Sequence, residues 1–131
     1  MPDFRKVTDD FSVAPQIGVD DIAAAADQGF ALVINNRPDG EAPDQPTSAQ
    51  MAAAAQAAGV AYVHIPVRGG PNAEQVQAVE AAIAGADGPV LAFCRSGTRS
   101  IVTWSLGQKD RPREELIRLG QAAGYDLSGV V

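Results

Sequence analysis

The sequence predicts an α/β fold: a small parallel sheet of about four or five strands flanked by helices. Short apolar runs rich in Val, Ile and Leu alternate along the chain with segments of helical pattern. Aromatic residues are only 5% of the chain and alanines are abundant, which predicts small helix faces packed on an aliphatic sheet. Apolar residues are 46% of the 131, enough for one core, so we expect a single domain over residues 1–131.

In the first half, the predicted elements are an extended piece at 11–13, a helix at 19–28, a strand at 31–35, a loop at 36–46 and a helix up to residue 58. Gly29 and Gly59 end the two helices, because glycine readily adopts the left-handed conformation found there. The loop contains three prolines and a glycine, which oppose regular structure. Thr47 or Ser48 is expected to cap the second helix.

In the second half, the predicted elements are a strand at 60–66, a turn at 68–72, a helix at 73–84, a strand at 89–93, a helix from about residue 100 and a last helix at 113–123. Asn72 is a suitable cap for the helix that follows it. Pro112 suits the first turn of the last helix. Strands that alternate with helices require crossover connections, so the sheet should be parallel.

The net charge of −6 argues against a nucleic-acid partner and against an anionic membrane surface. No apolar stretch reaches the length of a spanning helix, and residues 1–6 are too polar for a secretion signal.

The single cysteine can form no internal disulfide and suits a reducing compartment, so we expect a cytoplasmic protein. One His and one Cys make no convincing metal site, and we expect no cofactor.

The strongest chemical signal is the segment from Cys94 to Arg99, Cys-Arg-Ser-Gly-Thr-Arg, directly after the predicted strand 89–93. Ligands bind at the carboxyl ends of the strands in parallel sheets, which is where this loop begins. A loop wound into an arc points backbone N–H groups at an anion, and the following helix adds its positive end. These features favour a thiolate, so we predict that Cys94 is the nucleophile and Arg99 a catalytic, anion-binding residue.

The neighbouring residues are predicted to help bind the anion, namely Arg95, Ser96, Gly97, Thr98 and Ser100. Gly97 permits a turn that a side chain would hinder, the hydroxyls can donate to the sulfur or the anion, and Arg95 suits a second negative group on the substrate. The alternative is an inert, buried cysteine before a polar turn. The order of strand, Cys, Gly, Arg and helix within a dozen residues favours the functional interpretation.

Three residues of the loop 36–46 are accessory candidates. Asp39 or Glu41 could act as an acid beside Cys94, although Pro-Asp-Gly is also a common turn sequence. Arg37 could bind an anion or pair with a carboxylate. His64, in the middle of an apolar strand, is interpreted as structural, with a role as base only if the strands bring it near Cys94.

The loop Cys94 to Arg99 resembles the active loop of rhodanese sulfurtransferases, which has the same spacing of Cys and Arg. The chain as a whole resembles the bacterial beta-lactamase-hydrolase-like, protein-phosphatase-like domain, whose members are often labelled sulfur transferases. This likeness rests on the residues 11–17, 33–41, 62–67, 94–100 with Trp104, and 123–127. The resemblance implies the fold of the dual-specificity and tyrosine phosphatases.

Two activities follow from the resemblance. Tyrosine and dual-specificity phosphatases have one more residue between Cys and Arg, usually a His where Phe93 stands, and an Asp general acid in the loop that matches residues 68–71. Sulfur transfer to Cys94 can expel a good leaving group and needs no such acid. We therefore expect a rhodanese-like sulfurtransferase that forms a persulfide on Cys94. The alternatives are a phosphatase that forms a cysteinyl-phosphate, and a non-catalytic anion-binding or thiol redox-sensing module.

Overall fold

The computed structural model describes residues 2–131. Its strands are β1 (Arg5–Thr8), β2 (Phe11–Ala14), β3 (Leu32–Asn35), β4 (Ala61–His64) and β5 (Val90–Phe93). Its helices are α1 (Val19–Asp27), α2 (Ser48–Ala58), α3 (Ala73–Ala84), α4 (Thr98–Leu106) and α5 (Arg113–Ala122). The α/β fold predicted from the sequence is confirmed, with element bounds that differ by a few residues.

The five strands form one sheet in the order β1-β2-β5-β3-β4. Strands β2, β5, β3 and β4 are parallel, and β1 pairs antiparallel with β2. The predicted parallel sheet is confirmed for these four strands, whereas β1 adds an antiparallel edge strand that was not predicted. Only Val7 of this strand is buried, so its sequence carries little apolar signal. Two residues link β1 to β2, a connection short enough for a hairpin but not for a parallel crossover.

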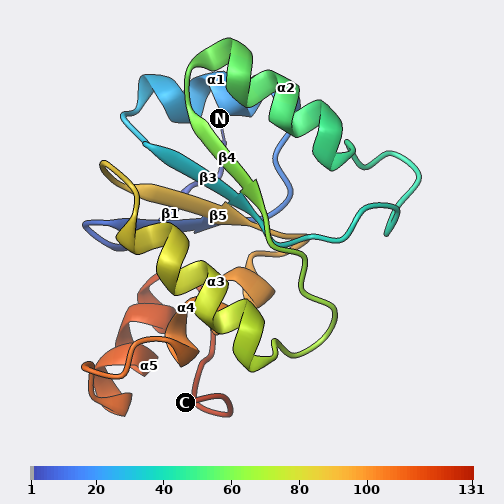
Figure 1. The fold of residues 1–131 in the computed structure, drawn as a ribbon. Coiled ribbons are helices and arrows are strands. Elements are labelled where there is room, and N and C mark those ends of the chain that lie inside the picture. Colours follow the sequence, from blue (N-terminus) through green and yellow to red (C-terminus); the bar gives the residue numbers. More distant parts are fainter. Residues whose placement is uncertain (1) are drawn as a thin grey trace.

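Helices cover both faces of the sheet (Figure 1), α1 and α2 on one face and α3, α4 and α5 on the other. Alternate residues of β3 and β5 enter separate cores, because successive side chains of a strand point to opposite faces. Val33 and Leu91 pack in the core beneath α1 and α2. Ile34 and Ala92 pack in the core on the side of the other helices. Strand β5 is central and fully buried, so the residue that follows it begins at the middle of the sheet edge.

The start of each crossover helix is fixed by local hydrogen bonds. Thr47 caps α2 and Asn72 caps α3, and in both cases the side chain accepts a hydrogen bond from a backbone N–H of the first turn. Helix α4 begins at Thr98, two residues before the predicted start, because Gly97 takes the cap position with φ of +92°. The Cys94 loop is therefore shorter and more tightly wound than its sequence suggests.

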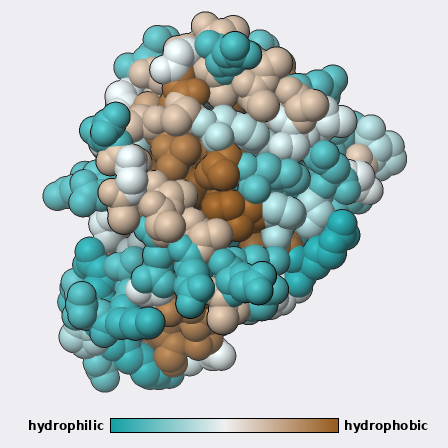
Figure 2. Space-filling model, viewed as in Figure 1, coloured by the Kyte–Doolittle hydropathy of each residue, from teal (hydrophilic) through white to brown (hydrophobic). Residues whose placement is uncertain are grey.

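Figure 2 shows a band of hydrophobic surface across the face on which β4 and α3 lie. A shallow groove of about 350 Å³ occurs between these two elements, where Val63 and the small residues Ala81 and Ala82 form part of its lining. Among residues 2–131, no helix is both long and apolar enough to span a membrane.

Candidate active site

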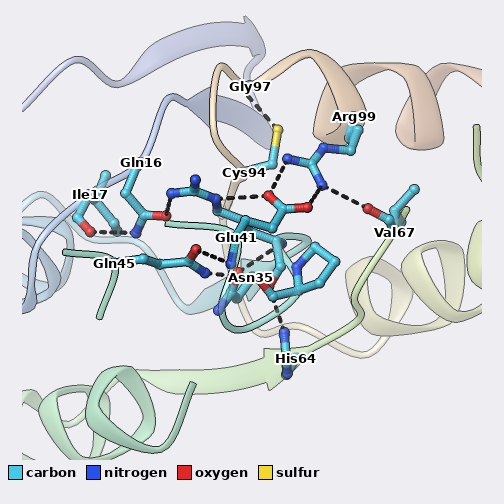
Figure 3. Close-up of polar contacts among 12 residues, drawn as sticks. Gln16, Ile17, Asn35, Glu41, Gln45, His64, Val67, Cys94, Gly97 and Arg99 are labelled. Carbon is cyan, nitrogen blue, oxygen red and sulfur yellow. Dashed lines mark hydrogen bonds and ion pairs between the residues drawn. The ribbon is translucent and has the colours of Figure 1, made fainter. Parts of the chain in front are cut away.

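The carboxyl ends of the parallel strands bring four loops together at one edge of the sheet. Gln16 follows β2, Glu41 lies in the loop after β3, Val67 follows β4, and Cys94 directly follows β5. Hydrogen bonds connect side chains or carbonyls from these four loops in a single cluster (Figure 3). This is the position at which parallel sheets bind ligands.

The Cys94 loop curls back on its own sulfur. The backbone N–H of Gly97 donates a hydrogen bond to Cys94 Sγ, with a distance of 3.1 Å between N and Sγ. Helix α4 begins at the next residue, so its positive N-terminal end lies beside the same sulfur. The Cys94 side chain is buried, and a substrate can therefore reach Sγ only when surrounding side chains shift.

The other polar residues of the loop have partners besides the sulfur. The Ser96 hydroxyl donates to Thr98 Oγ1 at 2.9 Å, and the Ser100 hydroxyl donates to Asn36 Oδ1 at 2.8 Å. The Arg95 side chain is exposed, while its carbonyl oxygen accepts the N–H of Gln16 at 3.1 Å. The hydroxyls of Ser96 and Ser100 thus stabilise the loop and its neighbours in this conformation.

The guanidinium of Arg99 is held on two sides. Its Nη1 donates to Glu41 Oε2 at 2.8 Å and to the Val67 carbonyl oxygen at 2.9 Å, and its Nη2 donates to Glu41 Oε1 at 2.8 Å. Hydrogen bonds to Glu41 raise the pKa of Arg99, and the nearby Cys94 sulfur raises it further. Of its five N–H donors, the Nε–H and one Nη2–H donate to no oxygen among residues 2–131, and the guanidinium lies close to the Cys94 sulfur. This pair of N–H groups has the parallel geometry that binds two oxygens of one oxyanion.

Glu41 joins Arg99 to a second arginine. Arg37 Nε donates to Glu41 Oε1 at 2.9 Å, and Arg37 Nη1 donates to Gln16 Oε1 at 3.0 Å. The Arg37 side chain is only 5% exposed. Of the two roles predicted for Arg37, binding an anion or pairing with a carboxylate, the structure shows the second.

Both accessory carboxyl groups accept hydrogen bonds in this conformation. Hydrogen bonds from Arg99, and then from Arg37, lower the pKa of Glu41 from its usual 4.5 to about 2, against the raising effect of burial. Asp39 Oδ1 accepts the backbone N–H of Ser48 at 2.8 Å, at the start of α2. The segment 68–71 after β4 contains no carboxylate.

His64 stabilises the loop after β3 from the side away from Cys94 (Figure 3). Its Nε2 lies 2.8 Å from the carbonyl oxygen of Arg37, and since a carbonyl only accepts, Nε2 carries the hydrogen. A cavity of about 520 Å³ opens beside it, lined in part by Pro38, Asp39 and Arg68. His64 is thus bound to the backbone of this loop, as expected for a structural histidine.

The charged cluster predicts a pH-dependent contribution to stability. A carboxyl whose pKa is lower in the folded state stabilises the fold above its unfolded pKa and loses that effect as the pH falls through its folded pKa. For Glu41 this interval runs from 4.5 down to about 2. We expect Glu41→Gln to lower the free energy of unfolding at pH 7 by about 2 kcal/mol, a value reduced for partial solvent exposure. The difference from wild type should shrink across that interval in urea unfolding experiments.

Glu115→Gln is the matched control, because Glu115 also pairs with an arginine, Arg111, at 3.2 Å. That pair lies at the surface, so its loss should cost less than about 1 kcal/mol. A stability difference for Glu41→Gln that stays constant from pH 7 to pH 2 would contradict the assignment.

The chain has the fold of the tyrosine and dual-specificity phosphatases, with the cysteine loop at the end of its central strand. A kinase associated phosphatase whose catalytic cysteine is replaced by serine has a TM-score of 0.71 over 98% of this chain and 88% of its own; at 12% identity, this shows the fold alone. The chain belongs to the family of the beta-lactamase hydrolase-like protein, phosphatase-like domain, whose sequence profile matches residues 3–110.

Two relatives support this assignment. A beta-lactamase hydrolase-like protein from Xylella fastidiosa is 37% identical over 129 residues, which are 95% of this chain and 30% of that protein. The chain therefore spans less than a third of this curated relative. A crystal structure described as a candidate phosphatase from Neisseria meningitidis is 33% identical, with a TM-score of 0.86 over 98% of this chain and 94% of its own.

The comparisons support an enzyme of the phosphatase-like family. The resemblance to the beta-lactamase-hydrolase-like, phosphatase-like domain is confirmed. The expectation of a rhodanese-like sulfurtransferase finds no support in them, because the family is described by a phosphatase-like domain and the structure from Neisseria meningitidis as a candidate phosphatase.

Proposed function

We propose that this chain is a cysteine-dependent phosphatase that hydrolyses phosphate monoesters. The observation that carries the proposal is the arrangement of donors around Cys94. The N–H of Gly97 points at Sγ, and the guanidinium of Arg99, whose pKa the sulfur raises, has two N–H groups that donate to no oxygen among the described residues. Backbone N–H groups and an arginine fork are the donors that stabilise a phosphoryl group in transfer.

The reaction would proceed in two displacements at phosphorus. Cys94 Sγ attacks the phosphoryl group, the S–P bond forms, and the ester P–O bond breaks to release the alcohol oxygen with its electron pair. A water molecule then attacks the cysteinyl-phosphate, the S–P bond breaks, and inorganic phosphate leaves while the thiolate is restored. Arg99 and the loop N–H groups would hold the phosphoryl oxygens in both steps.

The state of the carboxylates indicates which esters would react. Glu41 holds no proton at neutral pH, since its pKa is about 2, and residues 68–71 supply no carboxyl group. A positioned general acid is typically worth 10²–10⁴-fold when the leaving oxygen is a poor one. The substrate class that needs this help least is the aryl phosphates, whose phenoxide leaves readily. Phosphotyrosine belongs to this class.

Sulfur transfer is the second candidate, and two observations favour it. Four residues separate Cys94 from Arg99, as in rhodaneses, and residues 68–71 lack the carboxylate that dual-specificity phosphatases place there. In that reaction Cys94 would take the outer sulfur of a donor such as thiosulfate, release sulfite, and pass the sulfur to a thiol or cyanide.

A paired assay of the purified protein tests both candidates. We expect release of phosphate from p-nitrophenyl phosphate and phosphotyrosine at rates at least about 10²-fold above those for phosphoserine, for lack of a general acid. We expect negligible sulfur transfer from thiosulfate. Equal rates for aryl and alkyl phosphates would show that a general acid of the protein protonates the leaving oxygen. Sulfur transfer without phosphate release would replace the phosphatase by the second candidate.

A further inference from the structure

A tyrosine near the carboxyl-terminal end of the chain contacts the back of the Cys94 loop. The Tyr125 hydroxyl donates to the carbonyl oxygen of Ser96, with 2.7 Å between the oxygens. The same peptide unit carries the N–H of Gly97, which donates to Cys94 Sγ at 3.1 Å. In a trans peptide the C=O and the N–H point in opposite directions. A donor that holds the carbonyl outward therefore holds the N–H inward, toward the sulfur.

Tyr125 is itself fixed in place. Its ring lies under the guanidinium of Arg5, with 5.2 Å from Cζ to the ring centroid, and Arg5 also donates to the carbonyl oxygen of Ala123. The Tyr125 backbone N–H donates to the carbonyl oxygen of Gly120 at 2.8 Å. Burial raises the pKa of the Tyr125 hydroxyl above its ordinary value, so the group keeps its proton at neutral pH and can donate.

Without the hydrogen bond from Tyr125, the Ser96–Gly97 peptide could flip, so that its C=O and N–H exchange directions. Gly97 has φ of +92°, and glycine adopts either sign of φ at little cost. A flipped Ser96–Gly97 peptide would point the carbonyl oxygen of Ser96 at a thiolate and at a bound oxyanion, and both would repel it. A side chain at Gly97 would reduce this freedom, but its Cβ would overlap the Tyr125 hydroxyl.

We propose that Tyr125 is a positioning residue of the anion site, whose hydroxyl selects the orientation of the Ser96–Gly97 peptide in which the Gly97 N–H faces the anion. The inference rests on the proposed function, because it takes a phosphoryl oxyanion as the ligand of the loop. Tyr125 does not contact the reacting atoms and acts through the peptide. It also lies outside residues 3–110, the part that matches the family profile.

Tyr125→Phe tests the proposal, because it removes the hydroxyl and keeps the ring beneath Arg5. We expect inorganic phosphate to bind about 3- to 10-fold more weakly, the range that one net hydrogen bond gives. The measurement is a titration of ¹⁵N-labelled protein with phosphate, followed at the Gly97 amide resonance. That resonance should also shift in the phosphate-free variant, since its N–H would no longer be held toward Sγ. kcat/KM for p-nitrophenyl phosphate should fall by a similar factor.

Tyr62→Phe is the matched control. The Tyr62 hydroxyl accepts a hydrogen bond from Asn35 at 3.0 Å and bonds to the Ser48 hydroxyl at 2.7 Å, away from the Cys94 loop. Its loss should destabilise the fold at least as much as Tyr125→Phe, yet leave phosphate binding and the Gly97 resonance unchanged.

The proposal is overturned if Tyr125→Phe binds phosphate as tightly as wild type, or if Tyr62→Phe weakens binding equally. Phosphate binding is measured without turnover. A wild type that binds phosphate but hydrolyses no ester would therefore refute the proposed function and leave the role of Tyr125 testable. A wild type that binds no phosphate overturns both.

Discussion

Replacing Cys94 by serine is expected to abolish phosphate release while the protein still binds phosphate. The serine hydroxyl keeps its proton at neutral pH, and among residues 2–131 the only hydrogen bond to the Cys94 sulfur comes from the Gly97 N–H, which is no base. The donors that hold the anion, the Gly97 N–H and the Arg99 fork, remain in place. We expect kcat for p-nitrophenyl phosphate to fall by at least about 10³-fold, measured by release of p-nitrophenol. The Kd for inorganic phosphate should change by less than about 3-fold.

The comparison with wild type also separates the remaining alternatives. A non-catalytic anion-binding module would bind phosphate in both proteins and turn over no ester in either. A redox sensor would show oxidation of the single thiol to sulfenic acid by peroxide, again without turnover. Residual activity in Cys94→Ser at a tenth of the wild-type rate would show that Cys94 is not the nucleophile.

The cysteine loop could be predicted from the sequence because its parts are neighbours in the chain. Strand β5, Cys94, Gly97 and helix α4 follow one another within residues 90–106, and their order alone implies a loop at a sheet edge. The parallel core followed from the same kind of local pattern. Strand β1 was not predicted, because its four residues, Arg-Lys-Val-Thr, include only one apolar side chain and show no alternation.

The contacts between this loop and the rest of the chain could not be predicted from the sequence. Glu41 lies 58 positions before its partner Arg99, and Tyr125 lies 29 positions after Ser96. Such pairings depend on strand order, which places the loop after β3 beside the loop after β5. The sequence made Glu41 a candidate acid, whereas its position between two arginines keeps it ionised at neutral pH. No local pattern around Tyr125 indicates that its hydroxyl reaches the loop.

Replacing the guanidinium of Arg99 is also expected to cause a large loss of phosphatase activity. Arg99→Lys keeps the charge and removes the planar fork, so neither Glu41 nor a phosphoryl group can be bound through two parallel N–H groups. The loss of one preorganised oxyanion donor costs 10²–10³-fold in comparable sites. We expect kcat/KM for p-nitrophenyl phosphate to fall by about 10²-fold or more, with a larger effect on kcat than on KM. Steady-state kinetics at several phosphate-ester concentrations measure this.

Arg111→Lys is the matched control for this substitution. Arg111 donates to Gln108 and Glu115 and lies over the ring of Trp104, so it also makes several contacts with a planar guanidinium. It lies after the carboxyl-terminal end of helix α4, close to Trp104, which stacks on Phe11 in the core. Its replacement should lower stability slightly and leave kcat/KM unchanged. If Arg99→Lys lost no more activity than this control, charge alone would account for anion binding. The parallel fork would then have no part in catalysis, and Glu41 would serve stability only.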